Sequence, residues 1–247
     1  MSAVIANALI ANRVLREGTG NEIISKLNEI DGTDLSLKEV LGTVAGNVHE
    51  YDLDVINAKD QETGEPVYIL VNKEASEAAK RATLFDAGEI ELFKAILDTL
   101  YSPETNSPRD RFSISMGLIR DLLDDEIKKR YSYAETKYVI ERLVSLGWLT
   151  KYVRQGDEII APSLRTLAEL NSYLQEQYGQ EGTDTYRKCA GCNQVFTIGR
   201  QCTTEGCRLR LHNKCAEIYF RGRDESNQKC GLCGADFTTA LTVHPLS

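Results

Sequence analysis

The sequence predicts an α+β chain in three parts: two successive modules built from helices and a β-hairpin, then a small cysteine-rich module. Apolar residues recur twice at helical spacing along the first two thirds of the chain, and each set ends in two short apolar runs around a polar turn. All seven cysteines lie between Cys189 and Cys233. A length of 247 residues accommodates two or three domains.

The first module, residues 1–84, combines three helical stretches with a hairpin. The apolar spacing predicts helices over residues 4–15, 23–30 and 37–48. Two strands follow, over residues 53–58 and 66–71, with the polar turn 59–64 between them. Three helices followed by a hairpin is the element order of a winged helix, which we therefore expect for this module.

The second module, residues 85–183, repeats the scheme more clearly. Asp86 with Glu89 three residues later is a capping signal for a first helix through Leu100, and a third helix begins at Ser132 and ends at Gly147. The second helix is expected through Ile114, Leu118, Leu122 and Leu123. Strands over 148–153 and 158–161 then flank the turn 155–157. The polar stretch 175–184 is expected to be a linker.

Composition and charge limit the classes of function. With 42% hydrophobic and 27% charged residues the chain is not wholly disordered. No apolar run has the length of a membrane span, and the N-terminus lacks a signal-peptide pattern, so we expect an intracellular protein without a membrane partner. Residues 187–247 carry nine Lys and Arg against five Asp and Glu, whereas the rest is strongly acidic. This acidic majority disfavours broad binding to polyanions.

The basic residues of the second module do not form a clear phosphate-binding path. Acidic residues are interspersed among them, which favours a solvated face of mixed charge over phosphate contacts. The residues are Lys128, Lys129, Arg130, Lys137, Arg142, Lys151 and Arg154.

The third module, residues 184–247, has the spacing of a zinc-binding domain. Its candidate ligands are Cys189, Cys192, Cys202, Cys207, His212, Cys215, Cys230 and Cys233. These eight complete two tetrahedral sites, and C-x2-C turns let two sulfurs converge on one ion. An odd cysteine count outside a secretory context disfavours disulfides. The segment has few apolar residues, so we expect two structural zinc ions, closed to water, to supply much of its folding energy.

The order of four cysteines, one histidine and three cysteines resembles that of the cross-brace fingers, namely RING variants and PHD fingers. That resemblance implies that Cys189, Cys192, His212 and Cys215 share one zinc ion, and that Cys202, Cys207, Cys230 and Cys233 share the other. A sequential, LIM-like pairing is the alternative. PHD fingers usually place an aromatic residue two positions before the seventh ligand, where this chain has Gln228. A RING-like module is therefore favoured.

A RING module has no catalytic nucleophile; it docks a ubiquitin-conjugating enzyme in an apolar groove and positions the thioester. This chain departs from that groove. Only Ala190 and Gly191 stand between the first two ligands, and Gly234 follows the last one. Ile218, Tyr219 and Phe220 either contribute apolar contacts there or, as we favour, pack in the core. Weak or partner-dependent ligase activity is expected.

Taken together, tandem winged helices and a variant RING resemble one family, the non-SMC element 1 subunit of the SMC five/six complex. The stretch Leu211-His212-Asn213-Lys214-Cys215-Ala216, followed by a short aromatic run, is its most specific part. The resemblance implies a nuclear, chromosome-associated protein of DNA repair, paired with a MAGE-type winged-helix subunit and a kleisin subunit. It also implies RING-type ubiquitin-protein ligase activity stimulated by the MAGE partner, and DNA contact through the assembled complex.

Two other functions stay open at this point. The zinc and winged-helix modules are alternatively architectural, stabilising a DNA-associated complex without catalysis. A PHD-type reader of histone tails is a more distant option. The sequence contains no hydrolase motif and no glycine-rich phosphate loop, which disfavours small-molecule enzymology.

Overall fold

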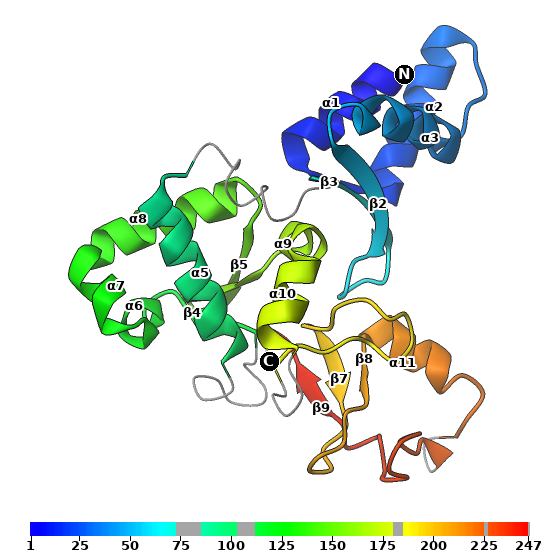
Figure 1. Ribbon diagram of the computed structural model, residues 1–247. Helices are drawn as coiled ribbons and strands as arrows, with labels where there is room; N and C mark the ends of the chain where they lie inside the picture. The colour runs from blue at the N-terminus through cyan, green and yellow to red at the C-terminus, as the bar shows by residue number, and fades with distance from the viewer. Residues whose placement is uncertain (73–84, 103–111, 180–184, 225–226, 247) are drawn as a thin grey trace. The chain divides into compact units, whose positions relative to one another are not determined.

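The computed structural model describes residues 1–72, 85–102, 112–179, 185–224 and 227–246 (Figure 1). The chain divides into two compact units. The first unit contains Met1–Asp60, Glu65–Ala82 and Leu164–Tyr173. The second contains Gln61–Gly64, Thr83–Ser163 and Leu174–Ser247. Among the helices of the described residues, none is long and apolar enough to cross a membrane.

The first unit opens with three helices and a three-stranded antiparallel sheet of order β1-β3-β2. Its elements are α1 (Ser2–Asn12), β1 (Val14–Arg16), α2 (Glu17–Asp31), α3 (Leu37–His49), β2 (Leu53–Lys59) and β3 (Pro66–Asn72). Ser36 and Glu39 form a reciprocal capping box that starts α3. Ile5, Leu9 and Val44 are fully buried between the helices. The three predicted helices and the predicted hairpin are therefore present.

The predicted first helix extends too far. It ends at Asn12, because Arg13 adopts a left-handed conformation (φ 62°) while its N–H donates to the carbonyl of Leu9. Val14 and Leu15 instead form β1, paired with Ile69 and Tyr68 of β3. Apolar periodicity did not separate these residues from the helix, because the apolar Val14 and Leu15 follow almost directly on its last residue.

A short helix far along the chain completes the first unit. α9 (Leu164–Glu169) packs against β3. The Arg165 guanidinium lies 3.0 Å from the Glu169 carboxylate, and Asn72 of β3 donates a 2.7 Å hydrogen bond to the same carboxylate. The sequence analysis places Arg165 and Glu169 in the second module. Their contact with Asn72 of β3 joins α9 to the first module's sheet, which the local sequence pattern does not reveal.

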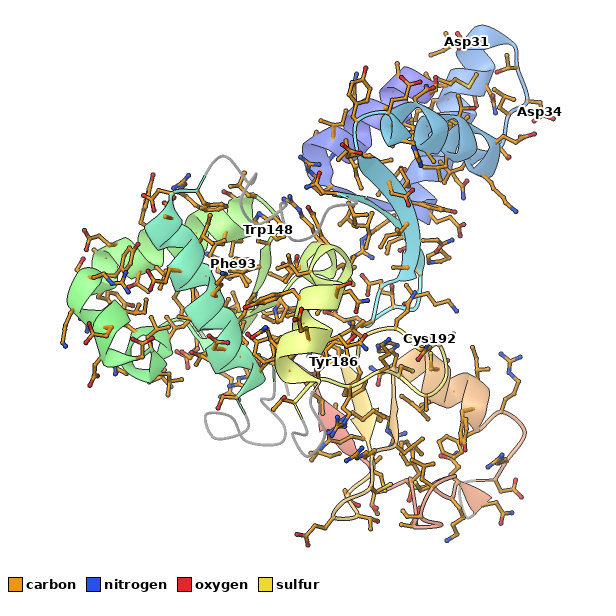
Figure 2. The ribbon with its side chains drawn as sticks, viewed as in Figure 1. Asp31, Asp34, Phe93, Trp148, Tyr186 and Cys192 are labelled. Atoms are coloured by element: carbon orange, nitrogen blue, oxygen red, sulfur yellow. The ribbon has the colours of Figure 1, made fainter. Side chains whose placement is uncertain are left out.

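The second unit contains another set of helices with a three-stranded antiparallel sheet, of order β4-β6-β5. Its elements are α5 (Ala87–Tyr101), β4 (Ile114–Ser115), α6 (Ile119–Leu122), α7 (Asp125–Arg130), α8 (Tyr133–Ser145), β5 (Leu149–Arg154) and β6 (Asp157–Pro162). α5 and α8 start at Asp86 and Ser132, as predicted, and each start is a capping box, with Glu89 and Glu135 as the partners. Phe93 of α5 lies 5.8 Å, between ring centroids, from Trp148, the residue before β5 (Figure 2).

The predicted second helix of this module is wrong. Ile114 belongs to β4 and pairs with Ile160, and Leu118 is exposed. Two short helices follow instead, and the Asp124 side chain caps the second one by accepting from the N–H of Ile127. The apolar residues lie close to helical spacing, but Ile114 is buried through a sheet.

The expected linker begins as a helix. α10 (Asn171–Tyr178) continues to Tyr178, whose ring stacks on that of Tyr101 with centroids 4.6 Å apart. The Tyr178 carbonyl accepts from the N–H of Tyr186 at 3.0 Å, so the entry to the zinc module is anchored. Residues 180–184 of the expected linker lie outside the described residues.

The last module is small and contains one helix and three short strands among its described residues. These are β7 (Gly199–Gln201), β8 (Arg210–Leu211), α11 (Asn213–Tyr219) and β9 (Leu241–Val243), with sheet order β8-β7-β9. Its core packs Phe220 and Phe237 beside the cysteines, with their ring centroids 5.1 Å apart, and Phe196 stacks on His212. The strand β9 follows the last candidate ligand and was not predicted.

Candidate metal centre

Cys189, Cys192, His212 and Cys215 form the first of two candidate metal-ligand groups among the described residues. Their four candidate ligand atoms lie within 4.8 Å of one another. The two cysteines at the start come from a tight turn, in which the N–H of Asn193 donates to the Cys189 carbonyl at 2.8 Å. This turn brings both sulfurs to the same side.

His212 reaches this group from the end of β8 and is held on both ring nitrogens. Its Nδ1 lies 3.3 Å from Cys192 Sγ, and its Nε2 lies 3.1 Å from the Val195 carbonyl oxygen. The arrangement suits a tautomer in which Nε2–H donates to Val195 and Nδ1 faces the metal. His212 is also the N-cap position of α11, which carries Cys215 one turn later.

Cys202, Cys207, Cys230 and Cys233 form the second group, again within 4.8 Å of one another. Cys230 and Cys233 lie in a turn like the first, where the N–H of Gly234 donates to the Cys230 carbonyl at 2.8 Å. Cys202 leaves the end of β7. The two groups therefore alternate along the chain, which is the interleaved arrangement implied by the cross-brace resemblance.

The sulfur separations fit zinc and not disulfides. Cys202 and Cys233 lie 3.6 Å apart between their Sγ atoms, as do Cys207 and Cys230, whereas a disulfide requires about 2.05 Å. A tetrahedral ion with Zn–S bonds of about 2.3 Å separates its sulfurs by about 3.8 Å. The two Cys/His groups are thus consistent with two zinc sites.

The thiol acidities show why such groups need a cation. Burial raises the pKa of Cys189, but its hydrogen bonds with His212 and Gly191 outweigh burial and lower this pKa to about 6. The hydrogen bond between the Cys233 thiol and the Thr204 hydroxyl lowers the pKa of Cys233 to about 6. Burial raises the pKa of Cys207 and of Cys215 to about 12. A bound dication stabilises all the thiolates together.

The surface beside the second group has two exposed apolar side chains. Ile218 of α11 is 49% exposed, and Leu232, between the last two ligands, is 67% exposed. The Tyr219 hydroxyl packs closely on Gly231, and a Cβ atom at that position would clash with it. Core packing was favoured for residues 218–220, and this holds for Phe220, whereas Ile218 faces outward.

The basic residues of the second module are largely paired. Lys128, Lys129, Arg130, Lys137, Arg142 and Lys151 each form an ion pair with an acidic side chain. Lys151, for example, lies 3.0 Å from Glu141 and 2.8 Å from Glu158. The helix α8 and the β5–β6 hairpin therefore present mixed charge, as expected, and little unopposed positive charge for phosphate.

Sequence reasoning missed the residues that support the ligands. Val195 contributes only its carbonyl to His212, and Thr204 its hydroxyl to Cys233, at 3.5 Å. A backbone carbonyl has no side-chain signature. Thr204 lies between Cys202 and Cys207, and this position inside the ligand spacing is the one signal that could have drawn attention to it.

Two interleaved Cys/His groups around a short helix, at the end of an α+β chain, define a protein with a RING-like zinc module. The family model of a RING-like domain matches residues 189–233. Residues 5–170 match the model described as "Nse1 non-SMC component of SMC5-6 complex", and the chain belongs to this family. The predicted resemblance and the α+β fold with a C-terminal RING-like domain are confirmed.

Individual relatives have low sequence identity to this chain, but their matches cover most of its length. The chain is 24% identical over 208 residues to "Non-structural maintenance of chromosomes element 1 homolog" from Bos taurus and from Homo sapiens, covering 84% of this chain and 71% of each relative. The Xenopus laevis homologue is 24% identical over 197 residues, covering 80% of this chain and 66% of the relative. A solved chain of the "Nse1-Nse3-Nse4 complex" superposes with a TM-score of 0.73 at 20% identity, covering 96% of this chain and 95% of that chain.

Proposed function

We propose that this protein is a subunit of an SMC5-6-type complex and acts as a partner-dependent RING-type ubiquitin-protein ligase in DNA repair. The observation that carries the proposal is the RING-like module at the end of a chain of this family. In this proposal the eight cysteine and histidine residues of the two groups each bind zinc, four to an ion. Localisation in the nucleus, on chromosomes, follows from the same assignment.

The proposed partners are a MAGE-type Nse3 subunit and a kleisin Nse4 subunit. They are supported by the superposed structure, which is that of an Nse1-Nse3-Nse4 complex. We further propose that both helix-and-hairpin modules are winged helices, with the boundaries 1–84, 85–183 and 184–247 separating three domains. Each module combines helices with a closing hairpin, and both sheets place the last strand in the middle.

The module supplies no reacting group in this mechanism. It binds the ubiquitin-conjugating enzyme and restricts the thioester to reactive geometries. Ile218 and Leu232 are the exposed apolar residues suited to this docking, because they flank the contact of Tyr219 with Gly231. The site remains poor in apolar contacts, since Ala190 and Gly191 are the residues between the first two ligands. The small number of apolar contacts favours a ligase activity that depends on a partner subunit.

The test is discharge of ubiquitin from charged conjugating enzymes by the chain co-purified with its MAGE-type partner. Ile218→Ala and Leu232→Ala should each slow discharge about tenfold while the zinc content stays at two ions, since a buried apolar anchor contributes about 1–2 kcal/mol. Ile30→Ala is the matched control, because Ile30 is 78% exposed on α2. Absence of discharge across a panel of conjugating enzymes would overturn the ligase assignment.

That negative result would support the second candidate, an architectural module. The paired charges of α8 and the β5–β6 hairpin favour protein contacts there over direct phosphate contacts. DNA contact is therefore proposed only through the assembled complex. Loss of complex assembly on removal of the zinc module, without any ligase activity, would identify the architectural role.

A further inference from the structure

Four residues between β2 and β3, Gln61–Gly64, belong to the second compact unit together with the zinc module. Gln61 is only 7% exposed there. Its side-chain oxygen Oε1 accepts hydrogen bonds from the backbone N–H groups of Thr197 and Ile198, each at 2.9 Å. The Thr197 hydroxyl donates to the same oxygen at 3.2 Å. One amide oxygen thus fixes two consecutive peptide groups.

Those peptide groups continue directly from the residues that orient His212. The Val195 carbonyl lies 3.1 Å from His212 Nε2, and the Phe196 ring stacks on the imidazole with centroids 5.8 Å apart and planes 19° from parallel. Residues 195–198 are all buried. The position of this segment therefore determines where the histidine of the first group points.

Gly64 makes a second contact from the same turn, to Lys214 on the helix that carries Cys215. Its backbone has φ +74°, and a Cβ atom there would lie 2.7 Å from Cβ of Lys214. Lys214 directly precedes Cys215 on α11. The turn thus reaches the chain beside two ligands of the first group, His212 and Cys215. Both contacts, from Gln61 and from Gly64, fall on segments that carry or support the first group.

We propose that Gln61 is a positioning residue for the first metal site, acting through residues 195–198 on His212. Groups that orient a metal-binding histidine commonly change metal affinity by about 10–100-fold when they are removed. Gln61 is one step further out, since it holds the peptide chain that holds the histidine. Its contribution comes from an acceptor oxygen, which makes the role separable from side-chain size.

The test uses the full chain co-purified with its partners, comparing Gln61→Leu with Gln61→Glu. Leucine keeps the approximate volume and removes the acceptor, whereas glutamate keeps an acceptor oxygen. Cobalt(II) replaces zinc, because a site of three cysteines and one histidine differs in visible absorption from a site of four cysteines. Chelator-driven metal loss is therefore followed at each site separately. Gln177→Leu, the same change on the exposed face of α10, is the control.

Gln61→Leu should speed metal loss from the histidine-containing site about tenfold and leave the all-cysteine site within about twofold of wild type. Gln61→Glu should restore slow loss. Equal acceleration at both sites, no acceleration at either, or failure of Gln61→Glu to restore retention would each overturn the proposal. The inference rests on the proposed ligand role of His212. A wild-type chain that holds fewer than two metal ions would overturn the ligand role of His212. Two metal ions per chain, together with an unchanged rate of metal loss in Gln61→Leu, would overturn this inference alone.

Discussion

Replacing Glu169 with alanine should destabilise the first unit, because the buried Arg165 then loses the attraction of the Glu169 carboxylate. The Glu169 side chain is 0% exposed and that of Arg165 is 9% exposed. Arg165 Nε lies 3.0 Å from one carboxylate oxygen, and Asn72 of β3 donates to the other at 2.7 Å. The Glu169 carboxylate therefore joins two turns of α9 through Arg165 and joins α9 to the sheet through Asn72.

The magnitude follows from the distance and the burial. Two unit charges 3.0 Å apart attract by about 5–6 kcal/mol at an effective dielectric constant of about 20. Burial lowers the pKa of Arg165 in spite of the attraction of Glu169, so desolvation offsets much of that gain. Removing one partner of a buried pair costs about 3–5 kcal/mol, and we expect about 3 kcal/mol for Glu169→Ala. The apolar double variant Arg165→Met with Glu169→Leu should lie within about 1–2 kcal/mol of wild type.

Hydrogen exchange of the full chain measures this locally. The amides of β3 and α9 should exchange faster in Glu169→Ala by the factor that corresponds to about 3 kcal/mol, roughly 100-fold. Glu29→Ala, an exposed acidic residue on α2, is the control. Unchanged protection of β3 in Glu169→Ala would refute the contact between α9 and the sheet. A double variant as damaged as the single one would refute the electrostatic explanation.

Four further outcomes are expected. Ser132→Ala removes the capping box of α8 and should cost about 1 kcal/mol of stability, measured by thermal unfolding, whereas Ser132→Asp should not. Removal of zinc by a chelator should unfold the last module, seen as loss of exchange protection in β7–β9 with α5 and α8 unchanged. Acid should release zinc, because the pKa values of Cys189 and Cys233 lie near 6, below the ordinary thiol value. The stability that their thiolates contribute is complete above about pH 9 and declines as the pH falls through about 6. Bound metal moves this loss to lower pH still. Metal content after dialysis between pH 7 and pH 4 measures it, and retention at pH 4 would contradict the thiolate argument. The chain alone should bind duplex DNA no more tightly than about 1 μM at physiological salt in a mobility-shift assay, and tighter binding would contradict the neutralised α8 face.

The elements with local chemical signals were predictable from sequence. Asp86 with Glu89 marked one helix start, because the capping interaction involves residues three apart, and the helix starting at Ser132 was also predicted. Residues 155–157 marked a hairpin, and the structure places Gln155 (φ 53°) and Gly156 (φ 92°) in left-handed conformations there. The cysteine spacing marked the module that matches a RING-like domain.

What the sequence did not reveal depends on contacts between distant residues. The short strands β1 and β4 exist because Leu15 and Ile114 pair with strands more than 40 residues away, and apolar spacing alone favoured helices at both. The attachment of α9 to the first unit depends on Asn72, 97 residues from Glu169. Likewise, Gln61 supports the first metal group across a sequence separation of 136 residues.

Similarly, β9 is invisible to a search for ligands. Val243, 0% exposed, lies ten residues beyond Cys233, and β9 forms one edge of the sheet around β7. The RING-like family model ends at residue 233, so it does not include this strand either. The strand is defined by its pairing with Gly199–Gln201, which periodicity over three residues cannot indicate.

The alternation of the two ligand groups has a consequence for how the metal ions load. Binding at the first group closes a loop from residue 189 to 215, and binding at the second closes a loop from 202 to 233, so the two loops overlap. Closing either loop shortens the free path that the other must close, which reduces the chain entropy lost in the second step. Loading should therefore be cooperative even though the ions share no ligand. At half-saturating zinc the population should consist mainly of empty and doubly loaded chains, which native mass spectrometry can count directly.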